Sequence, residues 1–280
     1  MKNNPKLWRA EFPVPSKEDN KYSRGHAIVV GGGSYSTGAA RLSAVSALRA
    51  GAGLVTVICE EDAADIYAAH LTSVMVRVID SVRELKIVLK DERVQSVLIG
   101  PGCGLDKRTK DYVLTALKMG KNIVLDADAI TVFSKRPQEL ISAIKWSKSK
   151  VVLTPHEGEF ARIFERSKSR TLKTKVADVL AAAKLVGAVV LLKGAETVIA
   201  NPDGDFVIND NGKPTLATAG SGDVLAGIIA GLIAQGMDSY KAACAGAWLH
   251  GAASKQMGYG LIAEDLPNLL PKALDEIIDR

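Results

Sequence analysis

The sequence predicts an α/β fold in which a mainly parallel sheet lies between two layers of helices. Short runs of apolar and β-branched residues alternate with helical patterns up to Lys193. Most of these runs are apolar throughout, which is typical of strands that are buried on both faces. Strands and helices that alternate in this way form right-handed βαβ units, and such units build a parallel sheet.

The alternating part of the chain contains six predicted strands, at residues 26–30, 54–59, 94–99, 122–126, 150–154 and 188–193. The helices predicted between them include residues 39–50, 107–119 and 174–186. Because a parallel strand is followed by a crossover before the next one begins, the loops that leave the strands should all open on one edge of the sheet.

The pattern changes after Lys193, where two short runs flank a turn. Residues 197–200 and 205–209 lie on either side of Asn201-Pro-Asp-Gly204, whose Pro-Asp and Asp-Gly steps are strong turn signals, so we expect a β-hairpin. Three helices are then predicted, at residues 222–235, 239–257 and 262–279. No linker, composition shift or repeat marks a boundary, which predicts a single domain over residues 1–280 with an N-terminal extension at residues 1–20.

The charge of the chain does not indicate a nucleic-acid partner. Although the net charge is +5 and the pI is about 9.0, the Lys and Arg residues are scattered and form no long run. The densest group lies within residues 162–175, and we expect it to be the solvated face of a loop and helix. It consists of Arg166, Lys168, Arg170, Lys173 and Lys175.

Cysteine usage and hydropathy predict a soluble cytoplasmic protein without a membrane partner. Cys59, Cys103 and Cys244 are far apart and form no Cys-x-x-Cys pair, which argues against a disulfide framework or zinc site and fits a reducing compartment. Residues 1–24 are polar and lack the apolar core of a signal peptide. The longest apolar stretch, residues 224–234, has 11 residues, whereas a membrane span needs about 20.

Glycine-rich or polar clusters follow five of the predicted strands. They are Gly31-Gly-Gly-Ser34, Gly100-Pro-Gly-Cys-Gly104, Asp126-Ala-Asp128, Thr154-Pro-His-Glu-Gly-Glu159 and Lys193-Gly-Ala-Glu-Thr197. One such loop is routine packing. Because ligands bind at the carboxyl ends of the strands of an open α/β sheet, five loops on one edge predict a long ligand groove.

The segment Thr218-Ala-Gly-Ser-Gly-Asp223 precedes a strongly apolar predicted helix. Small residues before a helix let successive backbone amides converge on an anion, and the helix dipole adds to the attraction. Asp223, in the first turn, could accept a proton from a hydroxyl beside that anion. An Asp at a helix start is also a favourable cap, so this segment alone leaves both roles open.

Two common nucleotide-binding motifs are absent. Gly33-Ser-Tyr-Ser-Thr-Gly38 has the glycine spacing of a P-loop, but Ala39-Ala40 occupies the positions of the required Lys-Ser/Thr. No Gly-x-Gly-x-x-Gly follows a predicted strand. The sequence therefore predicts neither a P-loop protein nor a dinucleotide-binding Rossmann domain.

The anion-binding segment, placed after a Thr-Pro-x-x-x-Glu motif, resembles that of the ribokinase-like superfamily. This resemblance implies a three-layer α/β/α fold with a mainly parallel central sheet and a C-terminal helical segment. Within the superfamily the chain is similar to the NAD(P)H-hydrate dehydratases over about residues 20–275. The motifs that carry this similarity are Val29-Val-Gly-Gly-Gly33, Thr37-Gly-Ala-Ala-Arg41, Ile99-Gly-Pro-Gly102, Leu125-Asp-Ala-Asp128, Thr154-Pro-His-Glu-Gly-Glu159 and Leu192-Lys-Gly-Ala-Glu-Thr197. One departure is Ala219, which stands where the family usually has Gly.

The resemblance implies a role for each matching position. The catalytic base would be Asp223, and the anion hole would be formed by Ala219, Gly220, Ser221 and Gly222. The substrate would contact Ala39, Gly102, His156 and Asp223. The adenine nucleotide would contact Lys193, Gly194, Ala195, Glu196, Thr197 and Gly222. Glu159 would organise magnesium through water. Asp126 and Asp128 could hold magnesium, but a capping role is favoured, and His26, His70 and His250 are expected to be structural.

The activity implied is the nucleotide-dependent dehydration of (6S)-NADHX and NADPHX, the hydrated forms of NADH and NADPH, back to the reduced cofactors. ADP or ATP would donate the phosphoryl group, with Mg²⁺ as cofactor. Relatives also imply a homo-oligomer, such as a tetramer, and a separate NAD(P)HX epimerase as pathway partner. The alternatives are a small-molecule kinase of the same fold, acting on a vitamin precursor or sugar, and a nucleotide-sensing protein without catalysis.

Overall fold

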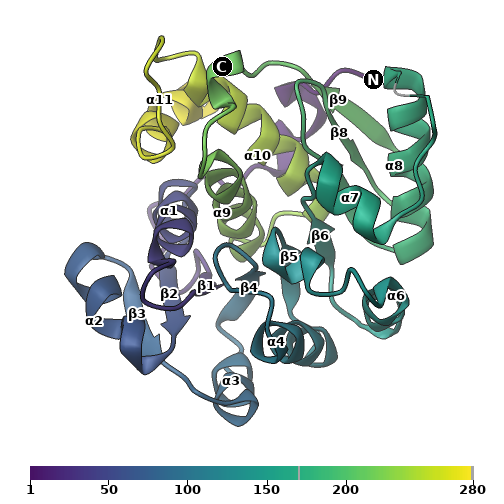
Figure 1. Ribbon diagram of the computed structural model, residues 1–280. Coiled ribbons are helices and arrows are strands. Elements are labelled where there is room, and N and C mark those ends of the chain that lie inside the picture. Colours follow the sequence, from purple (N-terminus) through teal and green to yellow (C-terminus); the bar gives the residue numbers. More distant parts are fainter. Residues whose placement is uncertain (170, 279–280) are drawn as a thin grey trace.

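The computed structural model describes residues 1–169 and 171–278, which form a nine-stranded sheet between two layers of helices (Figure 1). The strand order is β3-β2-β1-β4-β5-β6-β7-β8-β9, and the pairs from β3 to β7 are parallel. The strands are β1 His26–Val30, β2 Leu54–Cys59, β3 Met75–Val78, β4 Val94–Ile99, β5 Asn122–Leu125, β6 Val151–Leu153, β7 Val189–Leu192, β8 Thr197–Ala200 and β9 Phe206–Asn209. The pairs β7–β8 and β8–β9 are antiparallel, so the predicted hairpin after Lys193 is confirmed.

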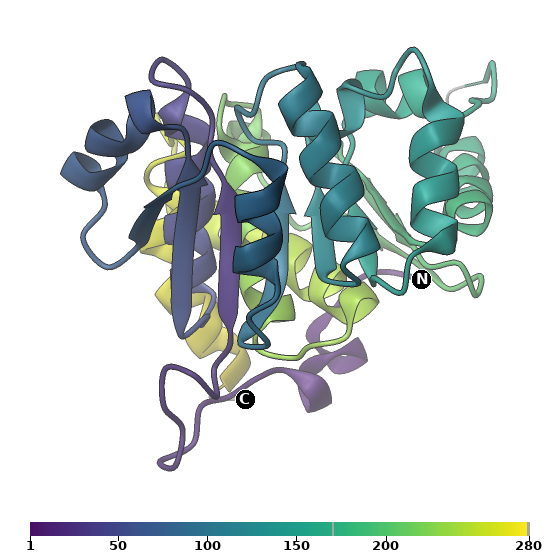
Figure 2. The same cartoon turned by 90° about the horizontal axis from the view of Figure 1, so that it is seen from below.

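The two helix layers cover opposite faces of the sheet. The helices are α1 Thr37–Arg49, α2 Glu61–His70, α3 Val82–Leu89, α4 Lys107–Lys118, α5 Asp128–Thr131, α6 Pro137–Trp146, α7 Glu157–Ile163, α8 Leu172–Val186, α9 Ser221–Ala234, α10 Ser239–Ser254 and α11 Leu266–Ile278. Figure 1 shows α1, α9, α10 and α11 on one face and α3, α4, α6 and α8 on the other, and Figure 2 shows the latter from below. Side chains alternate accordingly along β1: Ala27 and Val29 join the first core, Ile28 and Val30 the second.

Helix α9 is buried along almost its whole length, which explains why its sequence is apolar all round. It packs closely against α1 because glycines face the α1 backbone: a Cβ on Gly227 would lie 2.2 Å from the Ser43 carbonyl oxygen. The Ser43 hydroxyl also donates to the Asp223 carbonyl at 2.9 Å. These contacts fix the amino end of α9 at the carboxyl edge of the sheet.

The elements differ from the sequence predictions at a few places. Strand β3 was not predicted, and its residues are partly exposed at the edge of the sheet. The predicted helix 262–279 begins only at Leu266, because Ile262–Asp265 forms a turn in which the Ile262 amide donates to the Asp265 carboxylate at 2.9 Å. Its predicted last residue, Asp279, lies outside the described residues.

The first residues of the chain pack against the domain. The amide of Asn3 donates to the Ile208 carbonyl in β9 at 2.8 Å, and the amide of Ile208 donates to the Met1 carbonyl at 2.9 Å. Trp8 is 1% exposed and belongs to the first core. In the part of the chain that is described, no helix combines the length and apolar character that a membrane span needs.

Candidate functional site

The five predicted loop clusters all lie at the carboxyl ends of the parallel strands, around the amino end of α9. Hydrogen bonds connect loops that follow neighbouring strands of the sheet. The Ser36 hydroxyl donates to the Gly102 carbonyl at 3.1 Å, the Gly104 amide to the Asp128 carboxylate at 2.8 Å, and the Lys193 amide to the Pro155 carbonyl at 2.9 Å. Residues far apart in the sequence thus share one continuous edge of the sheet.

Helix α9 begins without a side-chain cap. Its N-cap residue Gly220 has a φ of +86°, a left-handed conformation that glycine adopts without strain. The first helical residues are Ser221, Gly222 and Asp223, and no side chain accepts a hydrogen bond from this helix start. Amide groups at an uncapped helix start, together with the helix dipole, favour an anion there.

A buried ion pair faces this helix start. The Lys193 ammonium lies 2.6 Å from Oδ1 of Asp126, whose side chain is 1% exposed. A Cβ on Gly222 would lie 3.2 Å from Nζ of Lys193 and 4.0 Å from Oδ2 of Asp126. Burial lowers the pKa of Lys193, but the charge and hydrogen bond of Asp126 outweigh it, so the net shift is upward and the lysine stays protonated. A positive charge therefore stands beside the predicted anion-binding turn.

The carboxylate of Asp223 sits in the same place. Burial and the negative charge of Asp126 raise its pKa to about 7, against the opposing effect of Lys193. Asp128 and Glu159 act weakly in the same direction as Asp126. A carboxylate whose pKa lies near neutral pH is suited to accept and return a proton, and this one lies in the first turn of a helix whose start is uncapped.

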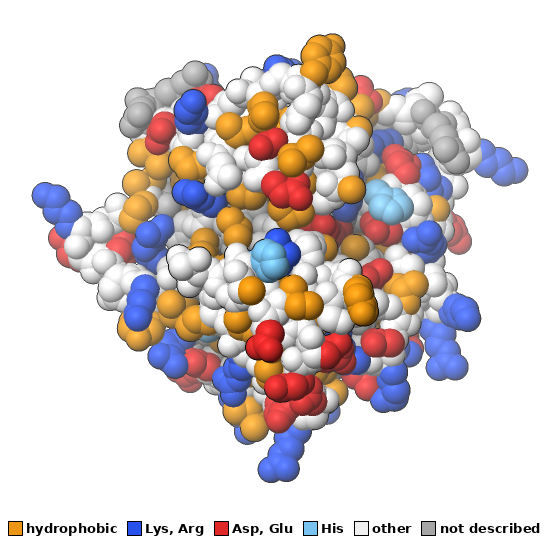
Figure 3. All heavy atoms as spheres, turned by 60° about the vertical axis from the view of Figure 1, so that its left-hand side comes forward, with side chains coloured by type: hydrophobic (Ala, Val, Ile, Leu, Met, Phe, Trp, Pro, Cys, Tyr) orange, Lys and Arg blue, Asp and Glu red, His pale blue; other side chains and the backbone are white. Residues whose placement is uncertain are grey.

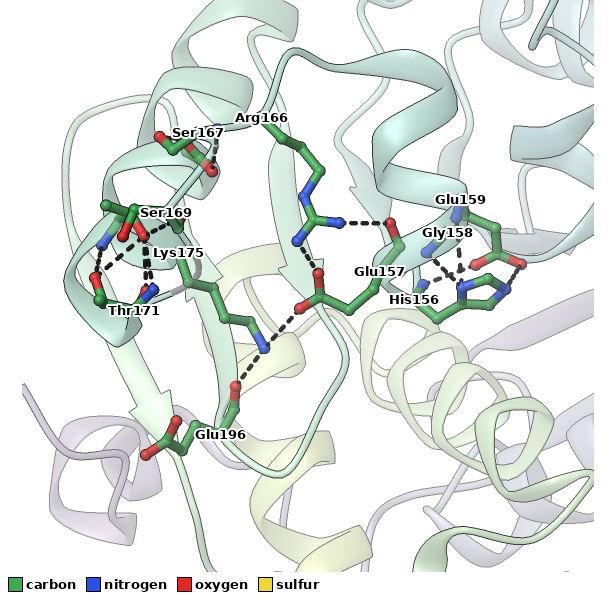
Figure 4. Close-up of polar contacts among 12 residues, drawn as sticks. His156, Glu157, Gly158, Glu159, Arg166, Ser167, Ser169, Thr171, Lys175 and Glu196 are labelled. Carbon is green, nitrogen blue, oxygen red and sulfur yellow. Dashed lines mark hydrogen bonds and ion pairs between the residues drawn. The ribbon is translucent and has the colours of Figure 1, made fainter.

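His156 and Glu159 form a reciprocal cap at the start of α7 (Figure 4). Nδ1 of His156 accepts from the Gly158 amide at 2.9 Å, while Oε2 of Glu159 accepts from the His156 amide at 2.8 Å. The other oxygen of Glu159 lies 3.3 Å from Nε2 of His156. The histidine side chain is 54% exposed and the glutamate side chain 6%. A structural role is thus established for both residues, and the exposed imidazole can still meet a ligand.

Ala39 and Gly102 lie next to each other across two loops. Gly102 has a φ of +68°, and a Cβ there would lie 2.7 Å from the Ser36 carbonyl oxygen and 3.4 Å from the Ala39 Cβ. A larger residue would therefore separate the loops after β1 and β4. The structure therefore places these two predicted substrate contacts side by side, at the carboxyl ends of the neighbouring strands β1 and β4.

The loop between β7 and β8 carries the predicted nucleotide contacts. Gly194, Ala195 and Glu196 are exposed, whereas Lys193 points inward to Asp126. The Gly194 amide donates to Oγ1 of Thr197 at 3.3 Å, and that hydroxyl donates back to the Gly194 carbonyl at 3.0 Å. The loop is therefore a closed turn whose residues 194–196 are exposed.

Carboxylate oxygens, the ligands that magnesium prefers, are present near the helix start: Asp126, Asp128 and Glu159 are all close enough to Asp223 to raise its pKa. These three are already engaged, with Lys193, the Gly104 amide and His156 respectively. Among the described residues, no group of three or more His, Cys, Asp or Glu side chains is arranged to hold a metal directly. The residues present therefore fit an ion that is bound mainly by water and phosphate oxygens.

The sequence model of the NAD(P)H-hydrate dehydratase family matches residues 27–278 of this chain. The chain belongs to this family. An ADP-dependent (S)-NAD(P)H-hydrate dehydratase from Neisseria meningitidis is 35% identical over 246 residues, which cover 87% of this chain and 80% of that protein. The ADP/ATP-dependent NAD(P)H-hydrate dehydratase from Bacillus subtilis, co-crystallised with ATP and Mg²⁺, superposes with a TM-score of 0.86 at 27% identity, covering 99% of this chain and 98% of that one.

A bifunctional NAD(P)H-hydrate repair enzyme from Moorella thermoacetica is 38% identical over 282 residues, covering 95% of this chain and 52% of that protein. The chain thus spans about half the length of this bifunctional relative. The predicted NAD(P)H-hydrate dehydratase family and the predicted ribokinase-like three-layer fold are both confirmed.

Two residues of this dehydratase-family chain that were not predicted to belong to the site contact residues that were predicted to belong to it. His250 in α10 is 8% exposed, and its Nε2 lies 3.2 Å from Oγ of Ser221. Burial lowers its pKa to about 4, so the ring is neutral at physiological pH. No sequence motif surrounds His250, and the packing of α10 on α9 brings it to Ser221 of the predicted anion hole.

The second such residue is Lys175, and for it and Arg166 the prediction of a solvated basic face is wrong. Their side chains are only 15% and 21% exposed, and both pair with Glu157. Arg170, also predicted on that face, lies outside the described residues. On the side of the molecule shown in Figure 3, Lys and Arg side chains are scattered among acidic ones.

Proposed function

We propose that the protein dehydrates (6S)-NADHX and NADPHX to NADH and NADPH, with ADP or ATP as the phosphoryl donor. The observation that carries the proposal is the first turn of α9, where an uncapped helix start, the Lys193 ammonium and the Asp223 carboxylate converge. The family match over residues 27–278 favours this activity over that of a small-molecule kinase of the same fold.

The chemistry follows from these groups. Water is a poor leaving group, so the C6 hydroxyl of the hydrated ring first receives the terminal phosphoryl group of the nucleotide. Asp223 accepts the hydroxyl proton, while the amides of residues 219–222 and the Lys193 ammonium stabilise the negative charge on the phosphoryl oxygens. Phosphate then leaves C6, assisted by the lone pair of the ring nitrogen, and loss of the C5 proton restores the double bond.

Magnesium, when bound, would neutralise charge on the nucleotide phosphates, and Glu159 would hold it through water. His156, Ala39 and Gly102 would contact the hydrated dinucleotide at the loops after β6, β1 and β4. Residues 193–197 and Gly222 would contact the nucleotide. In this arrangement the nucleotide loop after β7 lies next to His156 after β6, while Ala39 and Gly102 lie farther along the same edge, after β1 and β4.

The test is the absorbance near 340 nm, where reduced nicotinamide absorbs and the hydrate does not. Purified protein is mixed with NADHX or NADPHX, magnesium, and ADP or ATP in parallel, with a control that lacks nucleotide. A nucleotide-dependent rise, with release of one phosphate per NADH formed, is the expected result. Nucleotide hydrolysis that yields a stable phosphorylated product would instead establish a kinase, and absence of any turnover with the S epimer would refute the proposal.

The assembly and context of the protein remain proposals of the same kind. A symmetric homo-oligomer, such as a tetramer, is predicted from relatives, and light scattering coupled to size-exclusion chromatography measures it. A separate epimerase would supply the S epimer, in agreement with the bifunctional repair enzymes among the relatives. A cytoplasmic location stays a prediction from the cysteine pattern.

A further inference from the structure

A cluster of three charged side chains lies beside the predicted nucleotide loop (Figure 4). We call it the Glu157 cluster; it consists of Glu157 in α7, Arg166 in the segment between α7 and α8, and Lys175 in α8. Arg166 pairs with the Glu157 carboxylate and also donates to the Glu157 carbonyl at 3.4 Å. Nζ of Lys175 lies 3.4 Å from Oε1 of Glu157. Figure 4 shows the two basic side chains converging on one carboxylate from different segments of the chain.

Lys175 also holds the backbone of the nucleotide loop. Its ammonium donates to the Glu196 carbonyl at 2.7 Å, a charge-assisted hydrogen bond to a loop whose neighbouring residues are exposed. A Cβ on Gly194 would lie 2.7 Å from the same ammonium, so a glycine there leaves room for the lysine. The ammonium thus lies close to both the first and the last residue of the turn formed by residues 194–196.

The same ammonium connects this loop with the start of α7. Glu157 is the first residue of that helix, directly after His156 and two residues before Glu159. Ion pairs on an open surface contribute little. The Lys175 side chain is only 15% exposed, although that of Glu157 is 44% exposed, so the ammonium is better shielded from water than that of a surface lysine. The Lys193 amide ties the near end of the loop to the Pro155 carbonyl, just before α7, and Lys175 provides a second attachment at the Glu196 carbonyl.

We propose that Lys175 is a positioning residue that fixes the nucleotide loop, residues 193–197, against the helix carrying His156 and Glu159. This inference rests on the proposed function, because it assumes that the loop binds the adenine nucleotide. Lys175 acts through the Glu196 carbonyl and through Glu157, and Arg166 holds Glu157 in place. Its ammonium lowers the conformational freedom of the loop before the nucleotide arrives, which favours binding more than the chemical step.

The test compares Lys175→Met with Lys175→Arg and with Lys173→Met, an exposed lysine on the same helix that serves as the matched control. Loss of one hydrogen bond to a charged group corresponds to about a tenfold change in affinity. We expect Lys175→Met to raise the nucleotide KM about tenfold, with kcat and the KM for the hydrate within about twofold of wild type. Lys175→Arg, which keeps the charge and its donors, should recover most of the nucleotide affinity, and Lys173→Met should match wild type.

Glu157→Gln provides a second, independent variant. If Lys175 acts through Glu157, the nucleotide KM should rise in Glu157→Gln, and the double variant should be less impaired than the product of the single effects. A lowered KM in Glu157→Gln would overturn the proposal, because it would mean that the carboxylate competes with the nucleotide for the ammonium. An unchanged nucleotide KM in Lys175→Met would overturn it as well.

Calorimetric titration with ADP and magnesium, without hydrate, separates this inference from the proposed function. Wild-type protein that binds nucleotide, with weakened binding in Lys175→Met and recovery in Lys175→Arg, supports the positioning role even if the hydrate is not turned over. Equal binding by wild type and Lys175→Met refutes the positioning role and leaves the proposed function intact. Failure of the wild type to bind ADP or ATP would refute both.

Discussion

The Lys193 ammonium lies 2.6 Å from the Asp126 carboxylate, and 67 positions of sequence separate the two residues. Asp126 follows β5 and Lys193 follows β7, so the pair spans the β6 position at the carboxyl edge of the sheet. Sequence reasoning favoured a capping role for Asp126, yet its carboxylate faces Lys193 and lies near Gly222. Asp126 therefore connects the predicted nucleotide lysine with the predicted catalytic turn.

Replacement of Asp126 should change the pH dependence of turnover. The negative charge of Asp126 disfavours ionisation of Asp223, whose pKa is raised to about 7, so Asp126→Asn should lower that pKa. Lys193, released from its partner, acts in the same direction. We expect the acidic limb of the kcat–pH profile, measured from pH 5 to 9, to move to lower pH. The plateau value of kcat should fall. Asp111→Asn, a change at an exposed ion pair of α4, is the control, and an unmoved limb in Asp126→Asn would contradict the assignment.

Loss of the Asp223 carboxylate should abolish turnover but not nucleotide binding. Asp223→Asn keeps the size of the side chain and removes the proton acceptor, and general-base catalysis contributes about 10²- to 10⁴-fold. We expect kcat to fall by at least about a hundredfold in the 340 nm assay. Calorimetry should give a nucleotide dissociation constant within a few-fold of wild type. Activity equal to wild type would remove Asp223 from the mechanism.

The same substitution should stabilise the fold at alkaline pH. The folded-state pKa of Asp223, about 7, lies above its ordinary value of 3.8. The contribution of Asp223 to the free energy of unfolding is therefore fully present below pH 3.8 and is lost as the pH rises through 7. Because Asn does not ionise, Asp223→Asn should melt at a higher temperature than wild type at pH 8, with a smaller difference at pH 5. Thermal melts at both values decide this, and an equal difference at both would mean that the carboxyl is not buried as described.

A side chain at Gly222 should block the phosphates. A Cβ there lies 3.2 Å from the Lys193 ammonium, so Gly222→Val would fill the space between the ammonium and the helix start. We expect nucleotide-dependent turnover and nucleotide binding both to be lost. Gly258→Val is the matched control, because no atom lies within 4 Å of a Cβ at Gly258. Wild-type kinetics in Gly222→Val would refute the anion-hole assignment.

Removal of the His250 imidazole should weaken catalysis through Ser221. His250→Phe keeps an aromatic ring in the core but leaves the Ser221 hydroxyl without the partner that now lies 3.2 Å away. A buried group without its hydrogen bond costs about 1–3 kcal/mol of stability. Because Ser221 lies in the first turn of α9, we also expect kcat/KM to fall as the amides of this turn lose their fixed position. His70→Phe, at an exposed position of α2, should leave it unchanged. A reduced melting temperature with full activity would show that His250 serves the fold alone.

Much of the fold is readable in the sequence because each buried strand carries its own signal. The apolar runs that became β1, β2, β4, β5, β6 and β7 reflect burial on both faces, which the chain encodes locally. Strand β3 was not predicted because its residues are partly exposed at the edge of the sheet. The early start predicted for α11 failed because Ile262–Asp265 continues the apolar pattern but is held in a turn by the Asp265 carboxylate.

The sequence by itself determined the class of fold, the family, and the loops that carry chemistry, because glycine spacing and apolar periodicity are properties of neighbouring residues. Only the tertiary structure decided which side chains meet. The pairing of Lys193 with Asp126, the contact of His250 with Ser221, and the burial of Lys175 against Glu157 each join separate elements. Burial and long-range charge, which set the pKa of Asp223, depend on this packing and leave no local pattern in the sequence.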